Sequence, residues 1–368
     1  MRTRQTLRTA IIGAGRMAST IDDEIRSMDT WPSLKDQLPY SHAPCYQSCS
    51  DYQMVAACDL DETTCKTFCE RWDVPRHYLD YREMIEKERP DVVSISTPAD
   101  SHAELAIFAM EHGVRGVYCE KAMCCSLAEA DAIVDCVARH DVKFMLGAQR
   151  RHHPNFRRAR QIIESGRLGQ LVSVGSWFSS SLLHSLSHCV DSTLYLAGDA
   201  EPVSVSGQLA AVGSPDEIED RRITRAFGYD SASRCWNGDP GCLTYTAQLA
   251  NDVLLFHLPG VMDVRFEAVC TNGYLRIVDN NDRLVVYERR DKTYSFDRTE
   301  EPFAPASPNL ALVEDLARCI RTGATPLANE IVARYGMEIL MGTAQSHLKS
   351  GSTLAIPLKN RAMHIPSH

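Results

Sequence analysis

Residues 7–18 read L-R-T-A-I-I-G-A-G-R-M-A. The first half is short and apolar, which is typical of a buried parallel strand. It leads directly into the pattern G-x-G-x-x-A. In such a turn Gly13 permits the tight bend, Gly15 lets the backbone approach a pyrophosphate, and Ala18 is small enough for a helix to pack on the strand. The stretch therefore predicts a Rossmann-type phosphate-binding turn, with phosphates at the start of the following helix.

Strands and helices alternate up to about residue 150, which predicts a parallel, doubly wound α/β sheet. Further strands are expected at 53–59, 92–96, 114–119 and 143–147, and helices at 61–72, 101–112 and 126–140. The segment from Asp22 to Pro44 contains three prolines and is not expected to form one helix. We interpret it as an inserted loop beside the cofactor turn, a place where loops often cover a site.

The alternation of strands and helices ends at about residue 150. Beyond it, strand-like runs follow one another without helices between them. They lie at 171–180, 203–211, 242–249, 253–258, 263–270, 274–278 and 284–287. This pattern predicts a large, open, mainly antiparallel sheet, with a hairpin turn at Asn272-Gly273. We therefore expect an NAD-binding domain over 1–150 and an α+β domain for substrate binding and oligomerisation over 151–368. A C-terminal helix at 330–348 is expected to pack back on the first domain.

The composition excludes several classes of protein. The chain has 368 residues and a net charge of −9, so the basic surplus of a nucleic-acid-binding protein is absent. No stretch of about 18 apolar residues predicts a membrane span, and the first residues lack the apolar core of a signal peptide. The 14 cysteines include no C-x-x-C pair. We expect free thiols in a reducing cytoplasm, and no metal.

Asp59 ends the second predicted strand, 44 residues after Gly15 because of the insertion. A carboxylate at this place can accept hydrogen bonds from both ribose hydroxyls of the cofactor. Leu60 and Asp61 follow it, so a 2′-phosphate would meet two acids and no cation. This favours NAD over NADP. The alternative is that Asp59 only caps the next helix.

An ordered series of short motifs resembles a known family. Ser96-Thr97-Pro98, Ser101-His102-Ala103-Glu104 and Cys119-Glu120-Lys121-Ala122 follow one another as in the glucose–fructose oxidoreductase, inositol dehydrogenase and rhizopine-catabolism (Gfo/Idh/MocA) family. The resemblance extends from Thr9 to about Pro357. It implies an NAD(P)-dependent enzyme that acts on a sugar, cyclitol or related polyol. The apolar face of the expected open sheet favours a homodimer or homotetramer.

Two positions depart from the family's pattern. Glu120-Lys121 matches the family's Glu-Lys-Pro motif, with Ala122 in place of the proline. The family's Asp-x-x-x-His corresponds to His184 and His188, so a histidine replaces the aspartate. The first departure bears on how the lysine is placed, and the second on the chemistry.

Alcohol oxidation needs a base for the hydroxyl proton and a positive donor for the developing oxyanion. Lys121 follows a buried strand at its C-terminal end, where open α/β sheets bind ligands, and burial is expected to lower its pKa. His188 is the best base because its ordinary pKa lies near neutral pH. His184 and Asp191 share its helix face if the segment is helical, and a histidine pair with this spacing also suits a metal.

The remaining candidates are assigned by their places in these motifs. The predicted catalytic residues are Lys121, His188 and His184. The predicted cofactor-binding residues are Gly13, Gly15, Arg16, Met17, Asp59, Thr97, Pro98, His102, Glu120 and Lys121. The predicted substrate-binding residues are Lys121, Arg151, His184, His188, Asp191, Tyr40 and His42, with an ion pair as the alternative for Arg151 and plain loop packing for Tyr40 and His42.

Three functions fit these residues. The first is an NAD-dependent dehydrogenase of sugars or polyols. The second is a glycoside hydrolase or epimerase that oxidises its substrate transiently and recycles NAD, as some members of the family do. The third is a regulatory protein that binds NAD without catalysis, which an intact Glu120-Lys121 and His188 disfavour.

Overall fold

The computed structural model describes residues 6–28, 32–210, 229–260, 264–290, 295–302 and 305–367. The chain forms two compact units. The first comprises Met1–Cys124, Glu129–His153 and Pro305–Ile331, and the second comprises Cys125–Ala128, Pro154–Ala304 and Val332–His368. The predicted boundary near 150 lies close to the point where the chain leaves the first unit, but a later segment returns to that unit.

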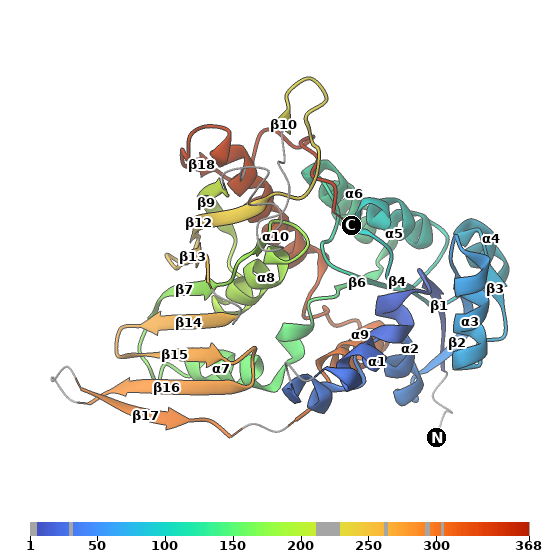
Figure 1. The fold of residues 1–368 in the computed structure, drawn as a ribbon, viewed down its shortest axis with the longest axis horizontal. Coiled ribbons are helices and arrows are strands. Elements are labelled where there is room, and N and C mark those ends of the chain that lie inside the picture. The colour runs from blue at the N-terminus through green and yellow to red at the C-terminus, as the bar shows by residue number, and fades with distance from the viewer. Residues whose placement is uncertain are drawn as a thin grey trace. The chain divides into compact units, whose positions relative to one another are not determined.

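The first unit is built on a six-stranded parallel sheet (Figure 1). Its strands are β1 (Leu7–Ile12), β2 (Tyr52–Cys58), β3 (His77–Tyr78), β4 (Val92–Ile95), β5 (Gly116–Cys119) and β6 (Lys143–Leu146). Their order, β3-β2-β1-β4-β5-β6, is that of a Rossmann fold and confirms the predicted fold class. The central strands β4 and β5 are buried along their whole length, as their continuous apolar runs predict.

Outside the insertion, the helices that follow these strands agree with the predicted pattern except at one place. They are α3 (Glu62–Trp72), α4 (Tyr81–Glu88), α5 (His102–Glu111) and α6 (Leu127–His140), with the 3-10 helices η3 (Ala99–Ser101) and η4 (Gln149–His152). The sequence pattern missed β3 and α4. A strand of two residues has no detectable period, and α4 has only Met84 and Ile85 as buried apolar residues.

The insertion is folded, so its prediction as a loop was wrong for most of its length. A π-helix η1 (Arg16–Thr20) leads into α1 (Ile21–Ser27), followed by the 3-10 helix η2 (Pro32–Gln37) and α2 (His42–Ser48). The buried Asp22 carboxylate accepts hydrogen bonds from the backbone N–H groups of Tyr40 (3.2 Å) and Ser41 (2.6 Å). These long-range contacts organise a segment that lacks helical periodicity of its own.

The helix that returns to the first unit is α9 (Pro308–Thr322), not the predicted helix at 330–348. It packs closely on β5, because a Cβ added to Gly116 would lie 2.5 Å from a side-chain atom of Ile320. The Tyr52 hydroxyl donates to the carbonyl of Val313 at 2.6 Å. From Val332 onward α10 (Glu330–His347) belongs to the second unit, where Gly342 and Thr343 face β9.

The second unit contains a ten-stranded sheet of order β17-β16-β15-β14-β7-β13-β12-β9-β18, with β8 paired to β12. Its strands are β7 (Leu171–Trp177), β8 (Ser180–Ser181), β9 (Pro202–Leu209), β12 (Gly241–Leu249), β13 (Leu254–Leu258), β14 (Arg265–Cys270), β15 (Gly273–Val278), β16 (Arg283–Arg289), β17 (Phe296–Glu300) and β18 (Leu354–Ala355). Only β13 and β7 pair in parallel, so the sheet is mainly antiparallel as predicted.

Helices cover one face of this sheet. Helix α7 (Pro154–Glu164) contacts β15 and β16 as well as α8 (Leu186–Leu196), which itself contacts β7 (Figure 1). Residues 213–241 are polar and rich in Gly, Pro and Ser, which predicts a long loop, and they fall partly outside the described residues. Their described end carries a short hairpin, β10 (Tyr229–Asp230) with β11 (Cys235–Trp236). No helix within the described ranges is long and apolar enough to cross a membrane.

Candidate cofactor-binding and active site

The glycine turn leaves β1 at the carboxyl edge of the first sheet. Gly13 adopts φ +88°, and a Cβ there would lie 2.9 Å from the carbonyl carbon of Ser96. Only glycine fits both the conformation and the space. Gly15 differs, because a Cβ there would meet nothing within 4 Å. The backbone at Gly15 is therefore open to a ligand, and it begins the helical stretch 16–27, whose first N–H groups lack intrahelical acceptors.

Asp59 is fixed against this turn. One carboxylate oxygen accepts from the N–H of Ala14 at 2.7 Å, and the other from the N–H of Asp61 at 3.0 Å. The cap of α3 is Asp61, whose side chain accepts from Thr64 at 2.6 Å. The alternative in which Asp59 only caps this helix is therefore wrong. A carboxylate has about four acceptor positions, so Asp59 retains capacity for hydroxyl donors.

His102 joins the loops that follow β4 and β5. One ring nitrogen lies 2.8 Å from the carbonyl oxygen of Thr97 and the other 2.8 Å from that of Ala122. The ring is fully buried, and this burial lowers the pKa of His102 although both carbonyls oppose the shift. A ring that joins two loops in this way suits a residue that supports them from inside. The peptide bond between Lys121 and Ala122 is cis, although alanine replaces the family's proline.

Glu120 and His42 form a buried pair next to Lys121. The Nε2 atom of His42 lies 3.0 Å from Oε1 of Glu120, and its Nδ1 atom lies 2.7 Å from the Ser94 hydroxyl. His42 is 1% exposed and Glu120 7%. Both side chains are thus engaged inside the first unit, whereas we expected His42 to face substrate or nicotinamide and Glu120 to contact cofactor. Loop packing, the alternative for His42, describes its position better.

Tyr40 is more accessible than His42. Its hydroxyl accepts a hydrogen bond from the Gln149 amide at 2.9 Å, and its carbonyl accepts one from Asn309 at 2.6 Å. Burial raises the pKa of Tyr40. The residue is therefore held at both ends, with its phenol near the start of η4.

Arg151 is fully buried and donates to the carbonyl of Leu327 at 3.3 Å. This contact ties η4 to the segment after α9. The position suits a structural role, although the contact described is with a backbone carbonyl and not the ion pair named as the alternative to substrate binding.

In the second unit, the three predicted polar residues do not share one helix. His184 is exposed and lies in the turn before α8, while the half-buried His188 and the buried Asp191 lie on α8 itself. The condition under which all three would share a helix face, a helical segment from His184 to Asp191, is therefore not met. His188 and Asp191, three residues apart, remain on one helix face.

The turn at His184 is held by Asp239, which the sequence analysis missed. Its carboxylate accepts from the N–H groups of Leu183 (2.8 Å) and His184 (2.7 Å). Burial raises the pKa of Asp239, against the effect of these donors. Asp239 lies in a loop rich in turn residues, and its spacing from His184 carries no signal. Ser94 and Tyr118 were also missed, because they lie inside strands whose apolar runs predict only burial.

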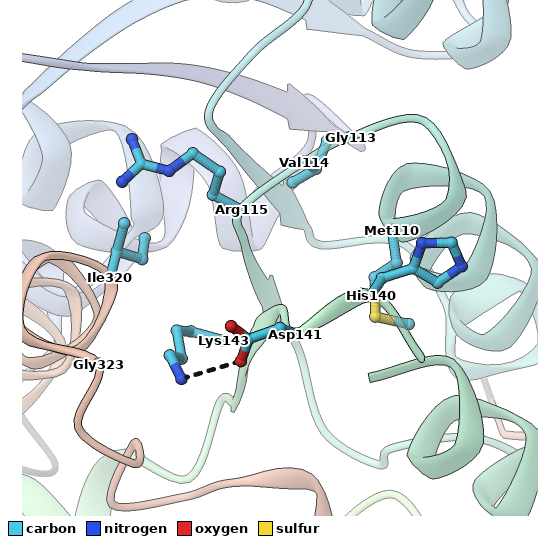
Figure 2. Close-up of a pocket in the computed structure, with 9 residues that line it drawn as sticks. All are labelled: Met110, Gly113, Val114, Arg115, His140, Asp141, Lys143, Ile320 and Gly323. Carbon is cyan, nitrogen blue, oxygen red and sulfur yellow. Dashed lines mark ion pairs between the residues drawn. The ribbon is translucent and has the colours of Figure 1, made fainter. Parts of the chain in front are cut away.

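A cavity of about 340 Å³ lies at the opposite edge of the first sheet (Figure 2). Its walls include Arg115, Lys143 and Ile320, next to the first residues of β5 and β6. Lys143 pairs there with Asp141 at 3.6 Å. Ligands of open α/β sheets bind at the carboxyl ends of strands, so this cavity is not the candidate site.

Among the described residues, one group has the composition of a metal site. Ligand atoms of Glu111, Cys136 and His140 lie within 4.8 Å of one another. Arg139 pairs with Glu111 at 3.8 Å, and burial raises the pKa of Cys136, which disfavours the thiolate that a metal would bind. We therefore assign no metal to it.

The sheet order, the open glycine turn and the carboxylate fixed beside it define a protein with a Rossmann dinucleotide-binding unit and a second α+β unit. Residues 36–148 match the model of an oxidoreductase family with an NAD-binding Rossmann fold, Gfo/Idh/MocA.

Known proteins support the same assignment. The chain is 29% identical over 164 residues to a myo-inositol 2-dehydrogenase of Thermotoga maritima, covering 45% of this chain and 42% of that protein. It is 25% identical to an NAD⁺-dependent scyllo-inositol 2-dehydrogenase of Bacillus subtilis, covering 75% and 81%. The fold resembles a levoglucosan dehydrogenase solved with NADH and L-sorbose, with a TM-score of 0.72, 18% identity, and coverage of 96% and 99%.

The resemblance to the Gfo/Idh/MocA oxidoreductase family seen in the sequence motifs is thereby confirmed. The alignment with the Thermotoga relative spans about two fifths of that protein's length.

Proposed function

We propose that this protein is an NAD-dependent oxidoreductase that acts on a hydroxyl of a sugar, cyclitol or other polyol. One observation carries the proposal: the buried His102 ring joins the carbonyls of Thr97 and Ala122, so the loop after β4 and the loop bearing Lys121 form one edge beside the glycine turn. A ligand bound at Gly15 and Asp59 would extend along this edge.

The residues present fit a dinucleotide. The open backbone at Gly15 and the helix start at Arg16 and Met17 would hold the pyrophosphate, Asp59 the adenosine ribose, and Thr97 with Pro98 the nicotinamide half. When bound, NAD supplies the acceptor for a hydride from a substrate carbon.

Side chains of the protein are assigned to bind the substrate hydroxyl and to accept its proton. We assign Lys121 to donate a hydrogen bond to the substrate oxygen and to stabilise negative charge on it. His188 is assigned as the base that takes the proton, with Asp191 on the same helix face to orient it or bind substrate. His184, exposed in the turn fixed by Asp239, is assigned to substrate binding.

The cofactor preference is tested at two neighbouring residues. Leu60, next to Asp59, is 94% exposed, so an arginine there is tolerated by the fold. The double substitution Asp59→Ser and Leu60→Arg removes charge-assisted bonds worth about 1.5–3 kcal/mol and adds a phosphate partner. We expect NAD affinity to fall roughly tenfold to a hundredfold, with a gain in NADP affinity, measured by fluorescence titration.

Asp61→Ser is the matched control for that experiment. Serine is as good a helix cap as aspartate, so we expect little change in stability and an unchanged affinity for NAD. Unchanged affinities in the double variant would contradict the assignment of Asp59.

We also propose that the protein forms a homodimer or homotetramer through the open face of the large sheet. Leu254 and Leu258 of β13 are 37% and 42% exposed, which is unusual for two leucines on one strand face. Leu254→Glu with Leu258→Glu is expected to yield monomers in light scattering after gel filtration. Leu348→Glu, at an exposed leucine outside the sheet, is the control and should leave the assembly intact. An unaltered mass in the double variant would exclude this face.

No disulfide bond joins any of the 14 cysteines, all of which lie among the described residues. This supports the proposal of a reducing compartment, the cytoplasm.

A further inference from the structure

The insertion brings a histidine into the interior of the first unit. His42 begins α2, and the chain just before it is anchored at several points. Asp22 holds the N–H groups of Tyr40 and Ser41, and Asn309 of α9 donates to the carbonyl of Tyr40. The position of the imidazole is therefore determined by contacts from α1 and α9 rather than by α2 alone.

The imidazole fills a polar site between two strands. Its ring stacks on Tyr118 of β5, with centroids 4.3 Å apart and planes inclined by 9°. Ser94 of β4 contacts Nδ1 at 2.7 Å and Glu120 contacts Nε2 at 3.0 Å. A neutral ring satisfies both contacts, since Nε2–H donates to the carboxylate and the serine hydroxyl donates to Nδ1. The ring has no nitrogen left for a substrate.

Glu120 is surrounded on its other sides as well. The Tyr118 hydroxyl donates to Oε1 at 3.2 Å, and the backbone N–H of Lys121 donates to Oε2 at 3.3 Å. A Cβ added to Gly147 would lie 3.0 Å from Oε1, so the carboxylate rests against the chain after β6. The carboxylate thus links the interior of the sheet to the backbone of Lys121.

We infer that His42, supplied by the insertion, is a positioning residue that holds the Glu120 carboxylate ionised and in place against the backbone of Lys121. The insertion then supports the site from inside the sheet, rather than covering it as a lid. The role of His42 in turnover rests on the proposed function of Lys121. The hydrogen bond by which His42 holds Glu120 does not depend on that function.

The charges around Glu120 give this inference a pH dependence. Burial by itself raises the pKa of Glu120, but the hydrogen bond from His42, followed by the charge of Lys121, brings it below its ordinary value. The other titratable groups that interact with this carboxylate are Tyr40, His102, Tyr118 and Cys119. A carboxyl whose pKa is lower in the folded than in the unfolded protein stabilises the fold at pH values above its unfolded pKa. This contribution is lost as the pH falls through the folded pKa.

The first experiment measures thermal unfolding of the full chain without cofactor between pH 4 and pH 8. Without the His42 bond, burial raises the pKa of Glu120, and ionisation opposes folding. We expect His42→Leu to lower Tm more at pH 7 than at pH 4, and His42→Gln, which keeps an amide donor, to recover at least half of the loss at pH 7. In a Glu120→Gln background the pH-dependent part of the effect should vanish. An equal loss of Tm at every pH, or the same loss in both backgrounds, would overturn the inference.

His42→Asn is the second variant if His42→Leu does not fold, because it stays polar but is too short to reach Glu120. His112→Asn is the control: His112 is an exposed histidine bonded to the carbonyl of Phe108, and its variant should show no pH-dependent change.

The second experiment separates this inference from the proposed function. With a polyol that the unaltered protein oxidises, His42→Asn should lower kcat at least tenfold and change KM less than threefold. It should also move the acid limb of the profile of kcat against pH up by about one pH unit. His42→Gln should restore most of the rate. A shift in KM alone would contradict a role through Lys121. If the unaltered protein turns over no polyol while the Tm pattern holds, the proposed function fails and the His42–Glu120 pair stands.

Discussion

Lys121→Ala is expected to lower turnover of a polyol by about a thousandfold, within the range of 10²–10⁴ typical of a positioned acid or base. The residue directly follows Glu120, whose carboxylate accepts its backbone N–H, and Ala122 after it is held by His102. The side chain is thus attached to a segment fixed on both sides. Its loss removes the proposed donor to the substrate oxygen without disturbing the glycine turn.

Cofactor binding should therefore survive in Lys121→Ala, with a Kd for NAD within about threefold of the original, measured by calorimetry. Lys143→Ala is the matched control, since Lys143 is also partly buried but lies at the start of β6 and pairs with Asp141. Turnover of this control should stay unchanged. Full activity of Lys121→Ala would exclude the lysine as a catalytic residue.

Two glycines two residues apart should respond in opposite ways to the same substitution. Gly13→Ala forces φ +88° on an alanine and places its Cβ 2.9 Å from backbone of Ser96. We expect roughly 2–4 kcal/mol of lost stability and a Tm lower by about 5–15 °C, together with loss of NAD binding.

Gly15→Ala should leave the Tm of the free protein unchanged, because its Cβ meets no protein atom. The same Cβ would occupy the space that a pyrophosphate needs, so the Kd for NAD should rise at least tenfold. Differential scanning fluorimetry with and without NAD measures both effects. Normal NAD binding by Gly15→Ala would show that the cofactor does not use this turn.

The Rossmann sheet was predictable because its signals are local. The run before Gly13 ends where β1 ends, and Asp59 directly follows β2, as the sequence pattern predicts. Short apolar runs also located β4, β5 and β6 to within two residues at each end. Neighbouring residues in the sequence are enough to predict these elements.

The insertion was not predictable, because distant residues determine its structure. Asp22 binds backbone N–H groups 18 and 19 residues away, and Asn309 reaches Tyr40 from α9. His42 consequently faces Ser94 and Glu120 inside the sheet, although its sequence position suggested contact with substrate. The same limit applies to Asp239, which holds His184 from another loop.

Transfer of deuterium from substrate to cofactor tests the proposed chemistry most directly. Protein with bound NAD is mixed with carbon-deuterated inositols, aldoses and polyols, quenched within one turnover, and the cofactor is analysed by mass spectrometry. We predict reduced cofactor carrying one deuterium for at least one compound, whether the reaction ends in net oxidation or returns the hydride. NAD that binds but acquires deuterium from no member of the panel would contradict the proposed oxidoreductase function.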